Sequence, residues 1–381
     1  MEFTGLHSTS LPNNEPSLFD SPAERYVKAR QSVQRFTLVQ LGLAIFSKEN
    51  SDKYVVHSYN FFLFPSTLGI RDVEFTVSAS SIQFLSHYGF DYNKFLKDGI
   101  PYMNEVQEEI LRQHLLADTW KVCSTNVDRD VLKKVIDEVT SWIVAAKEED
   151  TMILQDLNVS KAFFLCVIGY HMIEVQLVLR QALENVWTEP LEDKKVMVKK
   201  VSPEHRRLLE NSSDDHCQKK LILLSARGFT NLFQILVKVK KPLVGHNMLM
   251  DLMHLHDKFY RPLPESYEEF KRNIHNLFPV IIDTKTVTKS VQKKCLFPRV
   301  SSLMEAYAVL CSNLNPKGPP CPVISLASGC SRYGIRNLLM RLAMMHFSVV
   351  QFFLCQLICY CADPQMMWWR LSLLSRSISP C

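Results

Sequence analysis

The stretch over residues 242–260 constrains the fold more than any other part of this chain. Leu243-Val244 is typical of the end of a buried strand, Gly245-His246-Asn247 of a turn, and the apolar pattern over 248–259 of a helix. The carboxylate of Asp251 is therefore expected one helical turn past the Gly-His-Asn turn, near the carboxyl end of a strand. Open α/β sheets bind ligands at that end of their strands. The stretch predicts an α/β fold with a functional carboxylate at the edge of its sheet.

Two other interpretations of this stretch stay open from its residues alone. Asn247 can be the N-cap of the helix, because asparagine side chains accept backbone hydrogen bonds at that position, and Asp251 is then a solvated carboxylate. Alternatively, His246, His254 and His256 can bind zinc, although neither a CxxC nor an HExxH pattern accompanies them. Other segments of the chain bear on the choice.

The composition is that of a globular protein with room for more than one domain. The chain has 381 residues, of which 47% are hydrophobic and 22% are charged, and these values exclude wholesale disorder. A chain of this length can bury a sizeable core and hold two domains. The net charge of +5 at pH 7 suits a polyanionic partner, but it does not by itself identify a nucleic-acid-binding protein.

The cysteines indicate reduced thiols in an intracellular protein. The chain has 11 cysteines, an odd number, with no CxxC pair and no signal peptide. Cys355, Cys359 and Cys361 lie close together in sequence, which leaves a metal site as the alternative, but they belong to an apolar tail.

The first part of the chain predicts one helix, an antiparallel pair of strands and further helices. Ser21-Pro22 begins a helix, since proline is favoured at the first helical position. Residues 36–46 and 54–64 have the alternation of two strands joined by a charged turn. Apolar residues at helical spacing then predict helical structure over 78–102 and a helix over 105–116.

The middle of the chain has a different texture, which predicts a small inserted α/β domain. Helical patterns cover 131–146 and 173–183, and the basic run Lys194–Lys200 has the alternation of a strand. Residues 204–220 are charged and rich in Ser and Asn, which suits a linker, and 221–241 predicts an amphipathic helix. The lysines of the basic run either contact RNA or form a solvated face.

A second acidic residue follows a second buried strand. Residues 267–277 predict a helix, and Val280-Ile281-Ile282 predicts a buried strand that ends at Asp283-Thr284-Lys285. Asp283, like Asp251, is therefore expected near the carboxyl end of a strand.

The ordered set of segments resembles the poly(A)-specific ribonuclease family, which belongs to the DEDD 3′→5′ exonucleases. The stretch 242–264 resembles the second exonuclease motif of that family, and the resemblance covers about residues 2–310. The other matching segments are Glu2-Phe3-Thr4-Gly5, Ser21-Pro22-Ala23-Glu24-Arg25-Tyr26, Gln40-Leu41-Gly42-Leu43, Asn60-Phe61-Phe62-Leu63-Phe64-Pro65, Gly89-Phe90-Asp91-Tyr92-Asn93-Lys94, Gly99-Ile100-Pro101-Tyr102 and Phe278-Pro279-Val280-Ile281-Ile282-Asp283-Thr284-Lys285. Within the family, the chain is most similar to the members that trim piRNA precursors. The resemblance favours the catalytic interpretation of Asp251.

The resemblance implies a ribonuclease-H-like α/β fold, with a mixed sheet, flanking helices and a small inserted α/β domain. The expected parts are the N-terminal half of the exonuclease domain (1–125), the inserted domain (126–203), the C-terminal half (204–325) and a tail unlike the family (326–381). The first strand of the family carries an Asp-x-Glu motif, whose two acids lie on one face of the strand. Glu2 matches the second acid, so the first acid and most of this central strand are expected to lie before Met1.

The resemblance also implies two-metal hydrolysis of single-stranded RNA from its 3′ end. In the family, four carboxylates hold two Mg²⁺ ions and a nearby histidine acts as the base. The matching positions are Glu2 and Asp251 as catalytic metal ligands, His246 and Asn247 as substrate-binding residues, and Asp283 and Lys285 as supporting residues.

The first Asp, the fourth Asp and the His of the family are not found in this chain. The Mg²⁺ site is therefore expected to be incomplete and the nuclease activity impaired. The alternative is a catalytically inactive isoform that binds RNA or regulates another protein. The expected partners are RNA 3′ ends, either poly(A) tails or piRNA precursors, and a second copy of the chain in a homodimer, as in the family.

The tail departs from the family and is interpreted as a shifted reading frame from about residue 338. The third motif of the family, His-Glu-Ala-Gly-Tyr-Asp-Ala, is absent. However, codons that encode Leu339–Phe347 can encode Pro-His-Glu-Ala-Gly-Tyr-Asp-Ala-Phe when they are read one base earlier. The Asp-Ala pair is forced by Met344-Met345-His346, because methionine has one codon and histidine codons begin with CA.

The rival interpretation of the tail is a membrane anchor. Residues 342–362 contain no Asp, Glu, Lys or Arg, and about 18 such residues are enough for a transmembrane candidate. His346, Gln351 and Gln356 are atypical of such a helix. A membrane-tethered adaptor is therefore a third functional hypothesis. The expected location is intracellular and cytoplasmic, or on the cytosolic face of mitochondrial or endoplasmic reticulum membranes.

Overall fold

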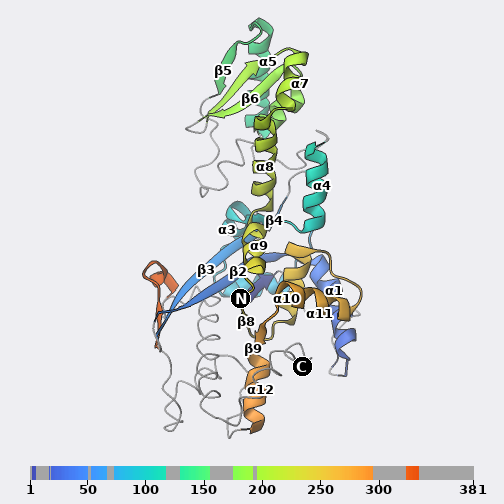
Figure 1. Cartoon of the computed structure of the whole chain (residues 1–381), viewed down its shortest axis with the longest axis vertical. Helices are drawn as coiled ribbons and strands as arrows, with labels where there is room; N and C mark the ends of the chain where they lie inside the picture. Colours follow the sequence, from blue (N-terminus) through green and yellow to red (C-terminus); the bar gives the residue numbers. More distant parts are fainter. Residues whose placement is uncertain are drawn as a thin grey trace. The chain divides into compact units, whose positions relative to one another are not determined.

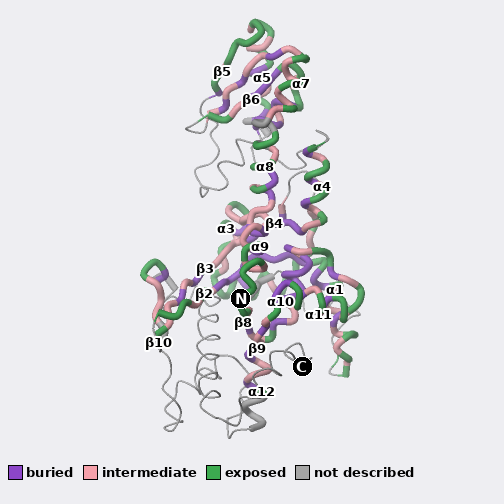
Figure 2. The backbone as a smooth tube through the Cα atoms, viewed as in Figure 1, coloured by how far each residue is buried: buried purple, intermediate pink, exposed green. Residues whose placement is uncertain are grey.

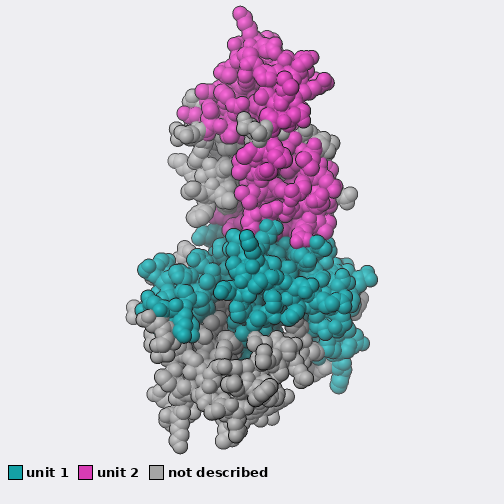
Figure 3. All heavy atoms as spheres, viewed as in Figure 1, with its two compact units in different colours: residues 1–64, 75–95, 232–381 teal, residues 65–74, 96–231 magenta. Residues whose placement is uncertain are grey.

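The chain folds into two compact units, which Figure 3 colours separately. The computed structural model describes residues 2–5, 17, 19–49, 53–66, 73–116, 129–154, 175–191, 195–294 and 323–333. Unit 1 comprises Met1–Phe64, Phe75–Phe95 and Leu232–Cys381, and unit 2 comprises Pro65–Glu74 and Leu96–Asn231. The domain bounds expected from the sequence stay predictions.

Unit 1 contains an antiparallel ladder, a short parallel pair of strands and several helices (Figure 1). The elements wholly or mostly in it are β1 (Glu2–Gly5), α1 (Pro22–Arg35), β2 (Leu38–Lys48), β3 (Lys53–Pro65), α2 (Ala79–His87), α3 (Tyr92–Asp98), α9 (Phe229–Val239), β8 (Leu243–Gly245), α10 (Leu249–Leu255), the π-helix η2 (His256–Tyr260), α11 (Tyr267–Leu277), β9 (Ile281–Asp283), α12 (Thr284–Lys294), β10 (Val323–Leu326) and the 3-10 helix η3 (Ser328–Tyr333). The mixed α/β fold class predicted from the sequence is confirmed.

The long strands β2 and β3 pair antiparallel, as predicted for 36–46 and 54–64. Their register runs from Gln40 opposite Phe62 to Lys48 opposite Tyr54. β10 adds to β3 in parallel, and the strand order is β1-β2-β3-β10. The first six residues of β2 are all buried, whereas its last residues become exposed (Figure 2). The core of this sheet therefore lies under the first half of β2.

The first strand differs from its prediction. Residues 2–5 form β1, which pairs antiparallel with β2 and places Glu2 opposite Gly42. The residues of this strand that the sequence contains therefore do form a strand. Among the described strands it ends the order instead of lying at its centre, because β8 and β9 pair only with each other.

Helix α1 begins where the sequence predicted it. Ser21 is its N-cap, Pro22 opens its first turn, and Glu24 closes a capping box in which the Glu24 carboxylate accepts from the Ser21 N–H at 2.7 Å. Buried Tyr26 joins α1 to α11, because its hydroxyl donates to the carbonyl of Pro264 at 2.7 Å and its ring packs on Phe270. The helix is thus tied to the segment that follows η2.

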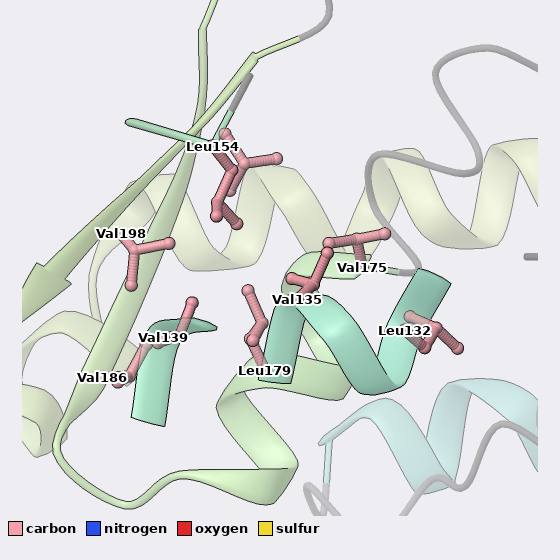
Figure 4. Close-up of a cluster of buried hydrophobic side chains, with 9 residues drawn as sticks. Leu132, Val135, Val139, Leu154, Val175, Leu179, Val186 and Val198 are labelled. Atoms are coloured by element: carbon pink, nitrogen blue, oxygen red, sulfur yellow. The ribbon is translucent and has the colours of Figure 1, made fainter. Parts of the chain in front are cut away.

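Unit 2 contains a three-stranded antiparallel sheet with helices against it. Its elements are β4 (Ile100–Tyr102), α4 (Glu105–Leu116), α5 (Arg129–Ala145), β5 (Thr151–Leu154), a helix over 175–182, β6 (Val186–Leu191), β7 (Lys195–Lys200), α7 (Pro203–Glu210) and α8 (Ser213–Arg227). The strand order is β5-β7-β6. Figure 4 shows the core of this sheet, where Val186 and Val198 meet Val139 of α5 and Leu179 of the 175–182 helix.

The predicted linker over 204–220 is wrong, because these residues form α7 and most of α8. Ser202 accepts from the His205 N–H at 3.3 Å and so caps α7, whose first residue is a proline. Arg206 on α7 donates to the carbonyls of Leu183 and Arg180 at 2.7 Å each. These bonds hold α7 to the end of the 175–182 helix.

The single helix predicted over 221–241 is two helices, α8 and α9, which meet at Gly228. Gly228 has φ +47, and a Cβ at this position would lie 2.1 Å from the carbonyl oxygen of Pro101. Thr230 then bonds to both backbone groups of Met103, with its hydroxyl donating to the carbonyl at 2.7 Å. The helix is interrupted at Gly228, where no side chain fits against Pro101 of β4.

Candidate functional site

The candidate site begins with two parallel strands that end side by side. β8 and β9 pair in parallel with Leu243 opposite Ile281 and Gly245 opposite Asp283. The residues that follow each strand, His246-Asn247 and Thr284-Lys285, therefore leave the same edge of the pair. The strand, turn and helix predicted for residues 243–259 are confirmed, with a π-helical last turn that the sequence did not predict.

The turn after β8 requires the residue types that the sequence provides. A Cβ on Gly245 would lie 2.7 Å from Cγ of Met248, so a side chain there would displace that buried methionine. Asn247 has φ 59, in the left-handed region that asparagine tolerates better than most residues. Backbone geometry thus explains Gly245 and Asn247 of this turn.

Asp283 binds the backbone of the turn that precedes α10 and of the first turn of α12. Its Oδ1 accepts from the backbone N–H groups of Asn247 and Lys285, and its Oδ2 accepts from that of Met248, all at 2.9 Å. The N-cap residue of α10 is Met248, with no side-chain capping bond of its own. The interpretation of Asn247 as N-cap is therefore wrong, since Met248 holds that position, and Asp283 binds the N–H groups of Asn247 and Met248 just before the helix.

His246 is held on the same edge by Thr284. Its Nδ1 lies 2.9 Å from the Thr284 hydroxyl, which donates in turn to the carbonyl of Gly245 at 3.1 Å. Burial lowers the pKa of His246, and the positive charge of Lys285 lowers it further, while Asp283 opposes both. Lys285 also donates to Oδ1 of Asn247 at 3.2 Å. The two residue pairs after the strands therefore form one polar cluster.

Asp251 lies in the first turn of α10, partly exposed, one turn beyond this cluster. The described residues do not by themselves form a metal site, since no three His, Cys, Asp or Glu side chains among them are grouped to hold an ion. The Asp283 carboxylate is already used by three backbone N–H groups. Glu2 lies on β1, but its side chain is outside the described set. The carboxylates that can be described therefore do not complete a two-metal centre.

The zinc interpretation is also not supported. His256 is buried, and both of its ring nitrogens have protein partners: Nδ1 lies 2.8 Å from the Arg261 carbonyl and Nε2 lies 3.2 Å from the Asn273 side-chain nitrogen. His254 is buried in α10, and it belongs to no metal-binding group of described residues. His256 fixes the end of the π-helix, which is a structural role.

The basic strand is confirmed as β7, but two of its lysines have structural contacts. Lys200 donates to the carbonyls of Ile143 and Ala146 at 2.8 and 2.7 Å, at the end of α5. Lys199 forms an ion pair with Glu149, which also contacts Nδ1 of His205 at 2.9 Å. RNA contact by this strand stays a prediction. The structural contacts just described involve Lys199 and Lys200 but not Lys195, the third lysine of β7.

The predictions for the C-terminal segment lie outside the described residues. They concern the helix at 301–310, the shifted frame from about residue 338 and the apolar run 342–362. Where the structure is described, none of its helices has both the length and the apolar character needed to cross a membrane.

Comparison with known proteins identifies relatives along most of the chain. The model of the CAF1 family ribonucleases matches residues 1–331. Human poly(A)-specific ribonuclease PNLDC1 is 56% identical over 337 residues, which cover 87% of this chain and 62% of that protein. The pre-piRNA 3′-exonuclease trimmer of Bombyx mori is 31% identical over 291 residues, which cover 74% and 52%. Poly(A)-specific ribonuclease PARN of Xenopus laevis is 30% identical over 304 residues, which cover 76% and 48%.

The chain thus spans between 48% and 62% of the length of these three relatives. The resemblance to poly(A)-specific ribonucleases drawn from the motifs is confirmed by these matches. With a family model that covers residues 1–331 and relatives at 56% identity, the chain belongs to the CAF1 family of ribonucleases.

Proposed function

We propose that this chain is a 3′→5′ exoribonuclease homologue that acts on the 3′ ends of single-stranded RNA. The observation that carries the proposal is the β8–turn–α10 unit, in which Asp251 follows a polar cluster at the carboxyl ends of two parallel strands. Sheets of the α/β class bind ligands at this edge. The family match over residues 1–331 supports nuclease chemistry at that place.

The substrate class follows from what the relatives are named for. Two of them are poly(A)-specific ribonucleases and one is a 3′-exonuclease of pre-piRNA. Poly(A) tails and piRNA precursors are both single-stranded RNAs with a free 3′ end. We therefore assign RNA 3′ ends as the substrate, with both RNA classes as candidates.

We propose a divalent cation, Mg²⁺, as the cofactor of this activity. Such ions activate a water molecule and stabilise the leaving oxygen in phosphodiester hydrolysis. Asp251 and Glu2 are the residues we assign as ligands. The described side chains do not complete such a site, so the proposal includes impaired hydrolysis by this chain.

The cluster next to Asp251 supplies the substrate contacts in this proposal. His246 has a lowered pKa and is therefore neutral near pH 7, so it is available for hydrogen bonding without repelling the nearby lysine. Asn247 is oriented by Lys285 through the 3.2 Å bond to its Oδ1. His246 and Asn247 thus act as substrate-binding residues, and Asp283 and Lys285 support them.

The test of this function is shortening of a 5′-labelled single-stranded oligo(A) in the presence of Mg²⁺. Asp251→Asn is expected to reduce the rate of 3′-end shortening at least ~100-fold, because the substitution removes the charge that holds the metal. Asp137→Asn, on the exposed side of α5, is the matched control and is expected to keep the wild-type rate. An Asp251→Asn protein as active as the control would show that the metal site is placed wrongly.

A second candidate function is RNA binding without hydrolysis. The observation that favours it is that the described side chains do not form a metal-binding group. In that case the protein binds oligo(A) equally well with Mg²⁺ or with a chelator, and the RNA stays intact in both. Mg²⁺-dependent shortening by the wild-type chain would exclude this candidate.

Several sequence predictions that go with this function stay predictions. They are the homodimer, the association with a membrane and the cytoplasmic location.

A further inference from the structure

A buried hydroxyl connects His246 to the strand that precedes it. Thr284 is fully buried, and its Oγ1 lies 3.1 Å from the carbonyl oxygen of Gly245 and 2.9 Å from Nδ1 of His246. Nothing in the function proposed above uses Thr284. The chemistry of this hydroxyl nevertheless determines what His246 can do.

The direction of the two hydrogen bonds follows from counting protons. A carbonyl oxygen can only accept, so the single hydroxyl proton of Thr284 is donated to Gly245. The Thr284 oxygen then has only lone pairs left for His246, and Nδ1 must be the donor. A neutral imidazole has one N–H, so Nε2 of His246 carries a lone pair.

Nε2 of His246 is the end of the ring available to a ligand. The ring is partly exposed, and the described residues provide no hydrogen-bond partner for Nε2. Burial keeps the ring neutral near pH 7, which preserves the lone pair. The side chain therefore faces a ligand as a hydrogen-bond acceptor and not as a donor.

We propose that Thr284 is a positioning residue that fixes His246 as the Nδ1–H tautomer, so that Nε2 accepts a hydrogen bond from a donor group of the bound RNA. The assignment of RNA as the ligand rests on the proposed function, whereas the tautomer rests on the two bonds of Thr284 alone. Phosphate oxygens and the ring nitrogens N1, N3 and N7 of adenine are acceptors, so they are excluded as partners of Nε2. The remaining donors of an oligo(A) with a free 3′ end are the ribose 2′-hydroxyls, the terminal 3′-hydroxyl and the adenine amino group.

The tautomer is tested by nitrogen NMR on the full chain labelled with ¹⁵N-histidine. Long-range proton–nitrogen correlations distinguish Nδ1–H from Nε2–H, and the His246→Gln spectrum assigns the signals of His246. Wild type and Thr284→Ser are expected to show Nδ1–H. Thr284→Val keeps the side-chain shape but removes the acceptor, so its proton is expected to move to Nε2, which can reach water.

Thr288→Val is the matched control for the loss of a buried hydroxyl. Thr288 lies one turn further along α12 and is 6% exposed, and its hydroxyl donates to the Thr284 carbonyl at 2.7 Å, away from His246. This variant is expected to keep the Nδ1–H pattern. An Nε2–H pattern in the wild type, or an unchanged pattern in Thr284→Val, overturns the positioning role.

The ligand is tested by the affinity of oligo(A) and of three analogues, measured by fluorescence anisotropy. A 2′-fluoro oligo(A) lacks the 2′-hydroxyls, an oligo(A) that ends in 3′-deoxyadenosine lacks the terminal 3′-hydroxyl, and an oligomer of purine riboside lacks the amino group without gaining another donor. Loss of one hydrogen bond corresponds to about a three- to tenfold loss of affinity. The wild type is expected to lose this factor with one analogue, which identifies the donor.

The variants show whether that discrimination passes through Thr284. Thr284→Ser and Thr288→Val are expected to keep the wild-type affinity ratio, and Thr284→Val is expected to lose it, because its Nε2 becomes a donor. Equal ratios in wild type and Thr284→Val overturn the acceptor role. If the wild type binds none of the RNAs, the proposed function and the RNA ligand fail together, while the nitrogen spectra still decide the tautomer.

Discussion

Asp283 connects the turn between β8 and α10 to the start of α12 through three hydrogen bonds. Its two oxygens accept N–H groups from the turn after β8, from the start of α10 and from the start of α12. The first turn of a helix has N–H groups without intrahelical partners, so a carboxylate there satisfies them and interacts favourably with the helix dipole. The position of Asp251 depends on this single side chain.

Replacing Asp283 by alanine is expected to lower the free energy of unfolding by about 2 kcal/mol, since caps contribute about 0.5–2 kcal/mol and hydrogen bonds to a charged group about 1.5–3 kcal/mol. Asp283→Asn is expected to cost less, because its amide oxygen still accepts. Urea unfolding measures both. The exposed Asp137→Ala is the control, and an Asp283→Ala midpoint equal to the control value would contradict the capping role.

At this scale the sequence predicts the strand, the turn and the helix, but not the cap. A local rule assigns the cap to Asn247, because asparagine precedes the helix and is a favoured cap residue. The carboxylate that holds the turn before α10 belongs to Asp283, 36 positions from Asn247, and it becomes a neighbour only when β8 and β9 pair. Hydrogen bonds between segments distant in sequence leave no periodic pattern in the sequence, so they cannot be predicted from local residue patterns.

At the scale of elements, hydrogen bonds on both sides of Gly228 hold the break between α8 and α9. On the side of α8, Arg227 bonds to buried Glu108 of α4, and Arg112 bonds to the same carboxylate at 2.8 Å. On the other side, Asn231 donates to the carbonyls of Leu224 and Gly228 at 2.9 Å each. The break at Gly228 is thus supported by bonds on both sides.

Gly228→Ala is expected to lower the free energy of unfolding by at least about 2 kcal/mol. The alanine would need φ near +47 and would place its Cβ 2.1 Å from the Pro101 carbonyl oxygen. Gly329→Ala is the matched control, because a Cβ there meets nothing within 4 Å, and its change is expected to stay within about 0.5 kcal/mol. Equal urea midpoints for the two variants would show that the close approach to Pro101 carries no cost.

Lys200 provides a second prediction about an element, the C-terminal end of α5. Its ammonium bonds to two carbonyls there, where a positive charge is also favoured by the helix dipole. Lys200→Met is expected to lower the free energy of unfolding by about 1 kcal/mol, whereas Lys195→Met on the same strand is expected to leave it unchanged. Thermal unfolding compares the two variants. A loss of RNA affinity in Lys200→Met without any loss of stability would instead make Lys200 an RNA contact.

Element boundaries show where sequence patterns work and where they fail. The helix predicted over 105–116 and that over 267–277 match α4 and α11, because both have a continuous amphipathic pattern. The apolar spacing over 221–241 continues through Gly228, so the pattern alone predicts one helix. Only the packing against Pro101 forces the break, and the sequence contains that information as a single glycine.

At the scale of the whole molecule, the histidines and carboxylates whose pKa values are lowered make the protein less stable in acid. Burial lowers the pKa of His246 and of His256 below the ordinary histidine value. Hydrogen bonds from Lys28 and Lys199 are the largest causes that lower the pKa of Asp20 and of Glu149, respectively. In each case the unfolded chain binds protons more readily than the folded chain.

The free energy of unfolding is therefore expected to fall as the pH is lowered from 7.5 to 5.5. The unfolded histidines take up protons below pH ~6.5 while the buried ones resist, which costs up to about 1.4 kcal/mol per pH unit for each histidine. His256→Gln, which removes the titrating group but keeps hydrogen-bonding atoms near Arg261 and Asn273, is expected to reduce this slope. Urea unfolding across that pH range measures it, and identical slopes for wild type and His256→Gln would contradict the assignment.

The family assignment could be made from the sequence because its motifs are ordered along the chain, from Glu2 to Lys285. The carboxylates of a metal site are a different case, because they come from separate elements. Asp251 is placed by its own strand–turn–helix unit, whereas Glu2 lies on β1, a strand of a different sheet. The residue patterns of β1 and of the β8–turn–α10 unit do not predict how the two sheets are placed relative to each other.

The dependence of the β8 turn on Asp283 also has a consequence for the order of events during translation. His246 and Asp251 leave the ribosome well before the residues that stabilise them, since Asp283 is 36 positions beyond Asn247. Until β9 emerges, β8 has no pairing partner, the N–H groups of Asn247 and Met248 lack the Asp283 carboxylate, and Thr284 is not available to His246. We therefore expect the turn after β8 to lack its stabilising bonds in the nascent chain until residues 281–285 have emerged, because the strand pairing and the bonds of Asp283 and Thr284 all come from that segment.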